Sequence, residues 1–180
     1  MRIISGTYKG RRFDLPRTLK ARPTTDFAKE ALFNILDNRL NYEELVVLDL
    51  FSGTGSIGLE FVSRGAITVT CVEQYAPHIK FIRKLIEKLG LDKLKLIQGD
   101  VYQYIHRYPQ AFDVVFADAP YADPRLIELP GLIFEAGIVK PEGLLIVEHS
   151  KLQHFDQHPH WEETRVYGSV RFSFFSQKLS

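Results

Sequence analysis

The sequence contains one cysteine and no long apolar run, and each of these absences excludes a class of protein. Because Cys71 is the single cysteine, an internal disulfide framework is excluded, and its apolar surroundings predict a buried thiol of the core. No uninterrupted apolar run approaches the roughly 18 residues that a membrane-spanning helix needs. The amino terminus also lacks the apolar block of a signal peptide. We therefore expect a cytoplasmic protein with no membrane partner.

Acidic residues are scarce near the amino terminus, although the net charge of the whole chain is only +1. Residues 1–30 contain eight Lys and Arg and three acidic residues, an excess of +5. The remaining 150 residues contain 15 basic and 19 acidic residues, an excess of −4. A basic arm on a mildly acidic body indicates a polyanionic partner that approaches from one side. A solvated, charged hairpin without any partner is the alternative.

The length and composition predict one soluble domain with a small appendage. The 180 residues are 45% hydrophobic and 25% charged, which is ordinary for a globular chain. Residues 2–15 alternate around a Tyr-Lys-Gly turn, which predicts a β-hairpin, and prolines mark a linker after it. We expect a basic hairpin with its linker over residues 1–23 and the main domain over residues 24–180.

The main domain alternates predicted strands and helices after an opening amphipathic helix from Thr25 to about Leu40. This rhythm predicts an α/β fold with a doubly wound, mostly parallel sheet and helices on both faces. The last two strands flank a tight turn at residues 167–169, which is unlike a typical nicotinamide-dinucleotide domain. The expected strands are residues 45–50, 67–73, 94–98, 112–118, 143–148, 161–166 and 170–176. The expected helices are residues 56–64, 76–89, 101–107 and 124–137.

A loop of small residues follows the first strand of this sheet. The stretch Val46–Gly58 passes from an apolar run through an acid to a glycine loop and then to a helical pattern. The glycines Gly53 and Gly55 let the backbone turn tightly and approach a ligand where side chains would collide. Ligands of open α/β sheets bind beyond the carboxyl ends of the strands. We therefore expect a nucleotide-like cofactor at this loop.

Acidic residues lie at the carboxyl ends of four successive predicted strands, or directly after them. Glu73 comes 20 residues after Gly53, a spacing suited to binding both ribose hydroxyls. Asp100 could accept a hydrogen bond from an adenine amino group while Val101 packs on the ring. Each acid alone could cap loop or helix amides or be an exposed charge, but the set is better explained by a cofactor. The four acids are Asp49, Glu73, Asp100 and Asp118.

The position of Asp49 favours a cationic cofactor. Phosphates bind where such a loop meets the start of its helix, and Asp49 would place negative charge at that point. The ammonium and sulfonium groups of S-adenosyl-L-methionine suit the same carboxylate. We therefore predict S-adenosyl-L-methionine rather than a nicotinamide dinucleotide as the cofactor.

The end of the fourth strand, Asp118-Ala119-Pro120-Tyr121, offers groups that could activate an exocyclic amine. Such an amine on a nucleobase is a poor nucleophile because its lone pair is delocalised into the ring. The Asp118 carboxylate and the Ala119 carbonyl could hold its two N–H groups so that the lone pair points at a methyl donor. Pro120 stiffens the turn, and Tyr121 could stack on a flipped base. A β-turn with an incidental Asp-x-Pro is the alternative.

Five segments along the chain carry motifs of a known family. They are Arg2–Gly6, Arg22–Asp26, Glu30–Leu36, Leu48–Glu60 and Ser63–Ala66. Together they resemble the bacterial 16S ribosomal RNA guanine-N2 methyltransferases, and the resemblance spans essentially the whole chain. The Arg-Pro-Thr segment with the helical pattern after it is far more specific than the glycine loop.

The resemblance implies a class I, S-adenosylmethionine-dependent fold of seven strands with the last strand reversed. It also implies methylation of one guanine N2 in 16S ribosomal RNA during 30S assembly. At matching positions, the family's guanine-binding residues are Asp118, Ala119, Pro120 and Tyr121. The family's cofactor-binding residues are Asp49, Phe51, Gly53, Gly55, Glu73, Asp100 and Val101. The departure is Ala119, where the family usually has proline. Alanine keeps the carbonyl, so we expect the chemistry to survive, although lost rigidity could lower the rate.

The same resemblance gives the basic arm a role in gripping phosphates around the target base. Such contacts supply salt-sensitive affinity with little sequence information. The residues expected in this role are Lys9, Arg11, Arg12, Arg17 and Arg22. Because this patch is small, the expected substrate is 16S ribosomal RNA within an assembling 30S subunit, and the expected enzyme is a monomer.

Other interpretations remain open. Adenine-N6 methyltransferases of nucleic acid share Asp-Pro-Pro-Tyr, but this chain has little room for a target-recognition domain. A protein-glutamine methyltransferase would favour Asn at position 118. A ribosome-assembly factor could use the cofactor fold without turnover, and a nicotinamide oxidoreductase would bind NADH. The late histidines His154, His158 and His160 are interpreted as a surface segment, so no metal is predicted.

Overall fold

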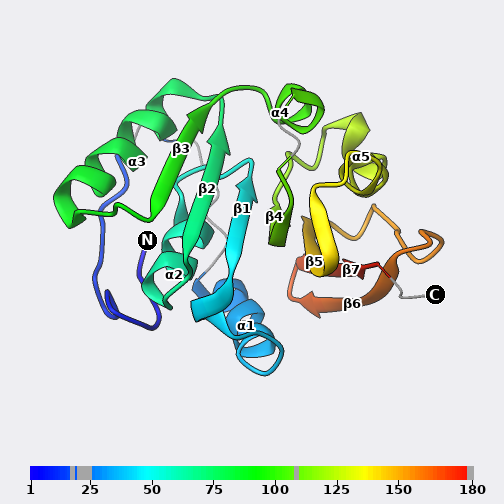
Figure 1. Ribbon diagram of the computed structural model, residues 1–180, viewed down its shortest axis with the longest axis horizontal. Coiled ribbons are helices and arrows are strands. Elements are labelled where there is room, and N and C mark those ends of the chain that lie inside the picture. Colours follow the sequence, from blue (N-terminus) through cyan, green and yellow to red (C-terminus); the bar gives the residue numbers. More distant parts are fainter. Residues whose placement is uncertain (17–18, 20–25, 108–109, 178–180) are drawn as a thin grey trace.

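A seven-stranded sheet forms the centre of the protein, in the strand order β3-β2-β1-β4-β5-β7-β6 (Figure 1). The computed structural model describes residues 1–16, 19, 26–107 and 110–177. Strands β1 to β5 pair in parallel, whereas β7 pairs antiparallel with both β5 and β6. The predicted doubly wound sheet with a reversed last strand is therefore confirmed. The strands are β1 (Val46–Leu50), β2 (Thr68–Glu73), β3 (Leu94–Gln98), β4 (Phe112–Ala117), β5 (Val139–His149), β6 (Trp161–Tyr167) and β7 (Val170–Ser176).

Helices cover both faces of this sheet and create two apolar cores. One core joins the sheet to α1, α2, α3 and the N-terminal residues, and the other joins it to α4 and α5. Within β1, Val47 belongs to the first core and Leu48 to the second, since successive strand residues point to opposite faces. No helix within the described ranges is long and apolar enough to span a membrane. The helices are α1 (Asp26–Leu36), η1 (Tyr42–Glu44), α2 (Ser56–Ser63), α3 (Ala76–Leu89), α4 (Val101–Arg107), η2 (Pro124–Ile127) and α5 (Leu129–Glu135).

The opening helix is shorter than its sequence pattern predicts. It ends at Leu36 rather than near Leu40, because the next residues close into a tighter turn. There the N–H groups of Asn38 and Arg39 donate to carbonyls three residues back, at 3.2 and 3.0 Å. The predicted start of this helix, Thr25, lies outside the described residues.

The segment before β5 also differs from the prediction of a single helix over residues 124–137. It contains the short helix η2 followed by α5, in which Pro130 occupies the first turn. Proline has no N–H group and is tolerated only where that group would have no helical partner, so a new helix begins there. Strand β5 then starts at Val139 rather than 143 and passes through Glu142 at a φ of 63°.

The N-terminal segment, residues 1–16, folds back on itself with one antiparallel bridge, between Arg2 and Arg12. Several of its backbone amides bond to α2 instead of to the facing part of the segment. The N–H groups of Ile4 and Ser5 each donate to the Glu60 carboxylate at 2.9 Å. The segment therefore combines hydrogen bonds across itself, such as Ile3 N to Arg11 O, with hydrogen bonds to α2.

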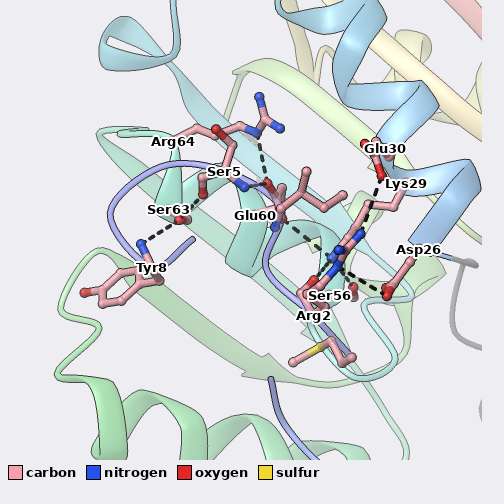
Figure 2. Close-up of polar contacts among 12 residues, drawn as sticks. Arg2, Ser5, Tyr8, Asp26, Lys29, Glu30, Ser56, Glu60, Ser63 and Arg64 are labelled. Atoms are coloured by element: carbon pink, nitrogen blue, oxygen red, sulfur yellow. Dashed lines mark hydrogen bonds and ion pairs between the residues drawn. The ribbon is translucent and has the colours of Figure 1, made fainter. Parts of the chain in front are cut away.

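A buried ion pair between Lys29 of α1 and Glu60 of α2 lies beneath this segment (Figure 2). The two side chains are 1% and 0% exposed, with Nζ and Oε2 3.6 Å apart. Lys29 also donates to the main-chain oxygen of Arg2 and to Ser56 Oγ. Arg64 Nε donates to the other Glu60 oxygen at 3.1 Å. Burial lowers the pKa of Lys29, which the Glu60 carboxylate opposes. The pair therefore joins α1, α2 and the N-terminal segment.

Replacing Glu60 with Gln should lower the free energy of unfolding by about 3–5 kcal/mol, because Lys29 would keep a buried charge without its ionic partner. Urea denaturation measures this loss. Glu30→Gln is the matched control: its carboxylate is 51% exposed and 3.5 Å from Arg2, and exposed pairs contribute less than about 1 kcal/mol. Equal losses in the two variants would contradict the assigned importance of the buried pair.

Candidate functional site

The loop between β1 and α2 is a tight turn held in an uncommon backbone conformation. Phe51, Gly53 and Gly55 have positive φ angles of 57°, 55° and 74°. Glycine adopts such angles without steric cost, whereas a residue with a side chain needs support from its surroundings. The Phe51 ring receives it from Tyr102 of α4, packed edge to face with centroids 5.8 Å apart. The loop is therefore shaped by its glycines and by one aromatic contact.

Glu73, the last residue of β2, fastens this loop to the start of α3. Its Oε2 accepts a hydrogen bond from Gly53 N at 2.7 Å, and its Oε1 accepts from the N–H groups of Gln74 and Tyr75 at 2.9 and 2.7 Å. The residue is only 7% exposed. Glu73 thus holds the loop that the sequence assigns to the cofactor, and its expected contact with a ribose stays a prediction.

Asp49 is also buried, at 1% exposure, on the side of β1 that faces α2. Its Oδ2 accepts from Gly58 N at 3.0 Å and lies 3.8 Å from Cys71 Sγ. Burial raises the pKa of Asp49 to about 7, against the stabilising hydrogen bond from Gly58. Asp49 therefore caps a backbone amide of α2, which is the structural role given above as the alternative to cofactor binding. Cys71 is fully buried, as its apolar surroundings predict.

Gly58 lets α2 approach the sheet closely enough for this bond. A Cβ atom at position 58 would lie 2.5 Å from Cys71 Sγ, 3.1 Å from Asp49 Oδ2 and 3.3 Å from a Val69 methyl group. Contacts that short force the helix or the strands to shift. The third glycine of the loop motif therefore serves helix–strand packing, the role that such a glycine has in dinucleotide-binding folds.

Gly58→Ala should destabilise the fold by about 1–3 kcal/mol, the usual cost of overpacking a core. Gly99→Ala is the matched control, since a Cβ there would meet nothing within 4 Å. Thermal or urea unfolding compares the two substitutions. An alanine at position 58 that is as well tolerated as the one at position 99 would show that the close approach of α2 is not required.

Asp100 and Val101 begin α4 beyond the end of β3. Asp100 Oδ1 accepts from Gln103 N at 2.9 Å, which is the helix-capping alternative given above. Val101 is 3% exposed and belongs to the second core. The structure thus gives both residues a structural role, and their contacts with an adenine ring stay predictions.

The Asp118–Tyr121 turn follows β4, next to the glycine loop. Leu50 of β1 is the register partner of Ala117, and Asp118 N lies 3.4 Å from Leu50 O. Asp118 is half-buried, and exclusion of water raises the pKa of its carboxyl well above the ordinary value. Repulsion from Glu148, and to a lesser degree from Asp49, adds to this shift. The turn and the loop thus start from paired strand ends.

The other three residues of the turn differ in exposure. Ala119 is 1% exposed and packs in the second core, whereas Pro120 is exposed. Tyr121 is 38% exposed, and its hydroxyl donates to Glu148 Oε1 at 3.0 Å. The Tyr121 ring is therefore held from its hydroxyl end while part of it stays open to solvent.

Glu148 of β5 is a site residue that the sequence analysis missed. It is 4% exposed, and it follows Val147, the register partner of Ala117. The signal was available, because Glu148 ends the fifth predicted strand just as acids follow the first four. Strands β1, β4 and β5 therefore bring the carboxylates of Asp49 and Glu148 close enough to raise the pKa of Asp118.

The basic residues predicted to bind RNA are only partly described. Lys9, Arg11 and Arg12 are exposed on the N-terminal segment, and the Arg11 guanidinium lies 5.3 Å from the centre of the Tyr8 ring. Arg17 and Arg22 lie outside the described residues. The exposed cations are thus available to a partner, and their role stays a prediction.

The late histidines are not gathered as metal ligands. The His160 ring stacks on Phe134 with centroids 4.2 Å apart, and His160 N donates to His158 Nδ1. In the part of the chain that the structure describes, no group of three or more His, Cys, Asp or Glu could hold a metal ion. The rings of His158 and His160 pack against Phe134 of α5, whereas His154 is exposed.

The chain is similar to a known family over nearly its full length. The family described as "Conserved hypothetical protein 95" matches residues 1–176. Ribosomal RNA small subunit methyltransferase D of Buchnera aphidicola subsp. Baizongia pistaciae is 32% identical over 148 residues, 82% of this chain and 75% of that protein. The Haemophilus influenzae protein of the same name is 33% identical over 156 residues, 84% of this chain and 79% of that protein. The solved structure of yhhF from Escherichia coli has a TM-score of 0.86 at 26% identity and covers 100% of this chain and 99% of its own.

Proposed function

The chain belongs to the family described as Conserved hypothetical protein 95, and on that premise we propose that it methylates the exocyclic N2 of a guanine in 16S ribosomal RNA. The methyl donor in this proposal is S-adenosyl-L-methionine. Relatives named ribosomal RNA small subunit methyltransferase D confirm the family resemblance that the sequence indicated. Those names specify neither the substrate atom nor the cofactor. We propose both from the chemistry of the site.

One observation carries the proposal: the glycine loop and the Asp118–Tyr121 turn leave neighbouring strands at paired residues, Leu50 and Ala117. A cofactor held by the loop would therefore lie beside a base held by the turn. Alignment of two reactants in this way supplies a large part of the rate gain in group transfer. No covalent enzyme intermediate is needed.

The residues of the turn have complementary tasks in the proposed reaction. The Asp118 carboxylate and the Ala119 carbonyl accept the two N–H groups of the guanine amine, and the nitrogen lone pair is directed at the methyl group. When bound by the glycine loop, S-adenosyl-L-methionine would supply the methyl group to the nitrogen, with its sulfur as the leaving group. The nitrogen then loses a proton. The Asp118 carboxylate is suited to accept it, because its raised pKa makes it a stronger base. Tyr121 stacks on the base.

The cofactor in this proposal spans the ends of β1, β2 and β3. Asp49, Phe51, Gly53 and Gly55 would line its methionine part, with the buried Asp49 carboxylate favouring the cationic groups. Glu73 would bind the ribose, and Asp100 with Val101 would bind the adenine. The backbone hydrogen bonds that Asp49 and Glu73 accept support these roles, because they fix the carboxylates and the loop before a ligand arrives.

Ala119 departs from the proline that is usual in the family. Its side chain is buried in the second core. In this proposal, that packing restrains the turn in place of the proline ring. The carbonyl acceptor is unchanged by the substitution. The proposal therefore includes an active enzyme rather than a cofactor-binding assembly factor without turnover.

The proposed partner is 16S ribosomal RNA within an assembling 30S subunit. Lys9, Arg11 and Arg12 are exposed where they could contact phosphates, and Arg17 and Arg22 are proposed for the same role from the sequence. Phosphate contacts give affinity but little sequence discrimination, so guanine choice would come from the pocket and from RNA shape. Such a substrate places the enzyme in the cytoplasm, and we propose that it acts there as a monomer.

The direct test is transfer of a labelled methyl group from S-adenosyl-L-methionine to 30S particles that lack the modification. After digestion, we expect the label in N2-methylguanosine, and we expect Asp118→Ala to abolish transfer. Label in N6-methyladenosine would move the assignment to the adenine enzymes. RNA binding without any transfer would leave the assembly-factor alternative.

The pH dependence of methylation should report on Asp118. The reaction needs its ionised carboxylate, so the rate should rise with pH through the raised pKa of Asp118. Glu148→Gln removes a negative neighbour that contributes to this shift. The pKa of Asp118 should then fall, and the acid limb of the pH–rate profile should move to lower pH. Rates over a pH series measure the shift.

Glu135→Gln is the control for charge alone, since Glu135 is exposed at the end of α5. Its pH–rate profile should match that of the wild type. An acid limb that stays in place in Glu148→Gln would mean that Asp118 is not the group whose ionisation limits the reaction.

A further inference from the structure

Helix α3 has one apolar face and one strongly basic face. Its buried residues are Ile79, Phe81, Ile82 and Leu85, which pack on the sheet. Its charged side chains are four cations and one carboxylate: Lys80, Arg83, Lys84, Lys88 and Glu87. All five are exposed. This helix belongs to the part of the sequence whose overall charge is acidic, so the cations are concentrated here rather than spread evenly.

A groove with a volume of about 400 Å³ runs along this basic face. Lys80, Arg83, Lys84 and Glu87 follow helical spacing, so they share one side of α3. The residues that line the groove are Ala76, Ile79, Lys80, Arg83, Lys84, Glu87 and Gln98. Its wall is therefore cationic, with an apolar contribution from Ile79 and a polar one from the end of β3. We call this the α3 groove.

The α3 groove lies between the N-terminal segment and the carboxyl edge of the sheet. Next to the groove on α3, Lys88 Nζ lies 5.8 Å from the centre of the Phe13 ring, and Figure 1 shows the blue N-terminal segment beside α3. Within the groove lining, Gln98 is the register partner of Glu73, which holds the cofactor loop. The helix that carries the groove thus extends from the edge where methyl transfer is proposed to the proposed RNA-binding segment.

We propose that the α3 groove binds the sugar–phosphate backbone of the single-stranded RNA that flanks the target guanine. The inference rests on the proposed function and adds a second contact surface to the N-terminal segment. Guanidinium and ammonium groups are suited to phosphate oxygens, and Arg83 can bind two of them at once. Strands β3 and β4 are three sheet positions apart, about 14 Å, a span that a few nucleotides of extended RNA cover.

Single-stranded RNA fits this surface better than a base-paired helix. The groove is lined by one helix and one strand end, and a flipped guanine requires its neighbours to be unpaired. The contacts expected are with phosphates and sugars, so the groove orients the strand without selecting its sequence.

The test is the salt dependence of RNA binding by the triple variant Lys80→Gln, Arg83→Gln and Lys84→Gln. Each phosphate contact on single-stranded RNA contributes about 0.7 to the slope of log affinity against log salt. Loss of three contacts should therefore reduce the slope by about 2 and weaken binding at low salt. The probe is a single-stranded RNA oligonucleotide, and binding is measured at several salt concentrations.

Glu87→Gln supplies a control of opposite sign within the same groove. Removal of its carboxylate should tighten RNA binding, whereas Glu135→Gln on α5 should leave it unchanged. Calorimetry with S-adenosylhomocysteine should give the same affinity for every variant as for the wild type. This result would show that the fold and the cofactor site are intact.

A triple variant with the slope and affinity of the wild type would overturn the inference, even if the enzyme methylates guanine. A tightening in Glu135→Gln equal to that in Glu87→Gln would overturn it too, because the effect would then reflect net charge alone. If the salt slope of the triple variant falls as expected but the wild type methylates no RNA, the RNA-binding role of the α3 groove is supported and the proposed function fails. The two proposals are therefore tested separately.

Discussion

The parallel pairing of β1 with β4 is the constraint on which the site depends. It brings Leu50 and Ala117 into register, so the glycine loop and the Asp118–Tyr121 turn leave the sheet as neighbours. Everything that keeps these two strand ends together also keeps the proposed donor and acceptor of the methyl group together. The apolar cores on both faces supply that stability, because both strands are buried on both sides.

Buried carboxylates hold several of the segments around this strand pair in place. Asp49, Glu73 and Glu60 each accept hydrogen bonds from backbone N–H groups: Asp49 joins β1 to the following helix α2, whereas Glu73 and Glu60 join segments 20 and 56 residues apart. A buried carboxylate without partners is costly, but one that accepts well-aligned N–H groups fixes its surroundings. Asp118 differs, because burial raises the pKa of its carboxyl and repulsion from Glu148 adds to this shift. Asp49, Glu73, Asp118 and Glu148 thus come from strand ends at one edge of the sheet, whereas Glu60 lies on α2.

Much of this arrangement could be predicted from the sequence, because it depends on local patterns. Apolar runs predicted strands β1 to β4 to within one residue, and the acid at or just beyond the end of each run marked the site edge. Long-range contacts could not be predicted. Nothing near Ile4 indicates that its amide bonds to Glu60, 56 residues away. The basic groove of α3 was missed because it needs the helix docked beside β3, and Glu148 was missed although its position at a strand end was visible.

The central claim is that a methyl donor in the glycine loop faces an amine held at the Asp118 turn. A crystal structure with S-adenosylhomocysteine, the demethylated cofactor, tests it most directly. The account predicts that the sulfur points toward the Asp118 carboxylate and the Ala119 carbonyl, with room between them for one methyl group and an amine. A sulfur directed away from this turn, or a cofactor bound at another edge of the sheet, would contradict it.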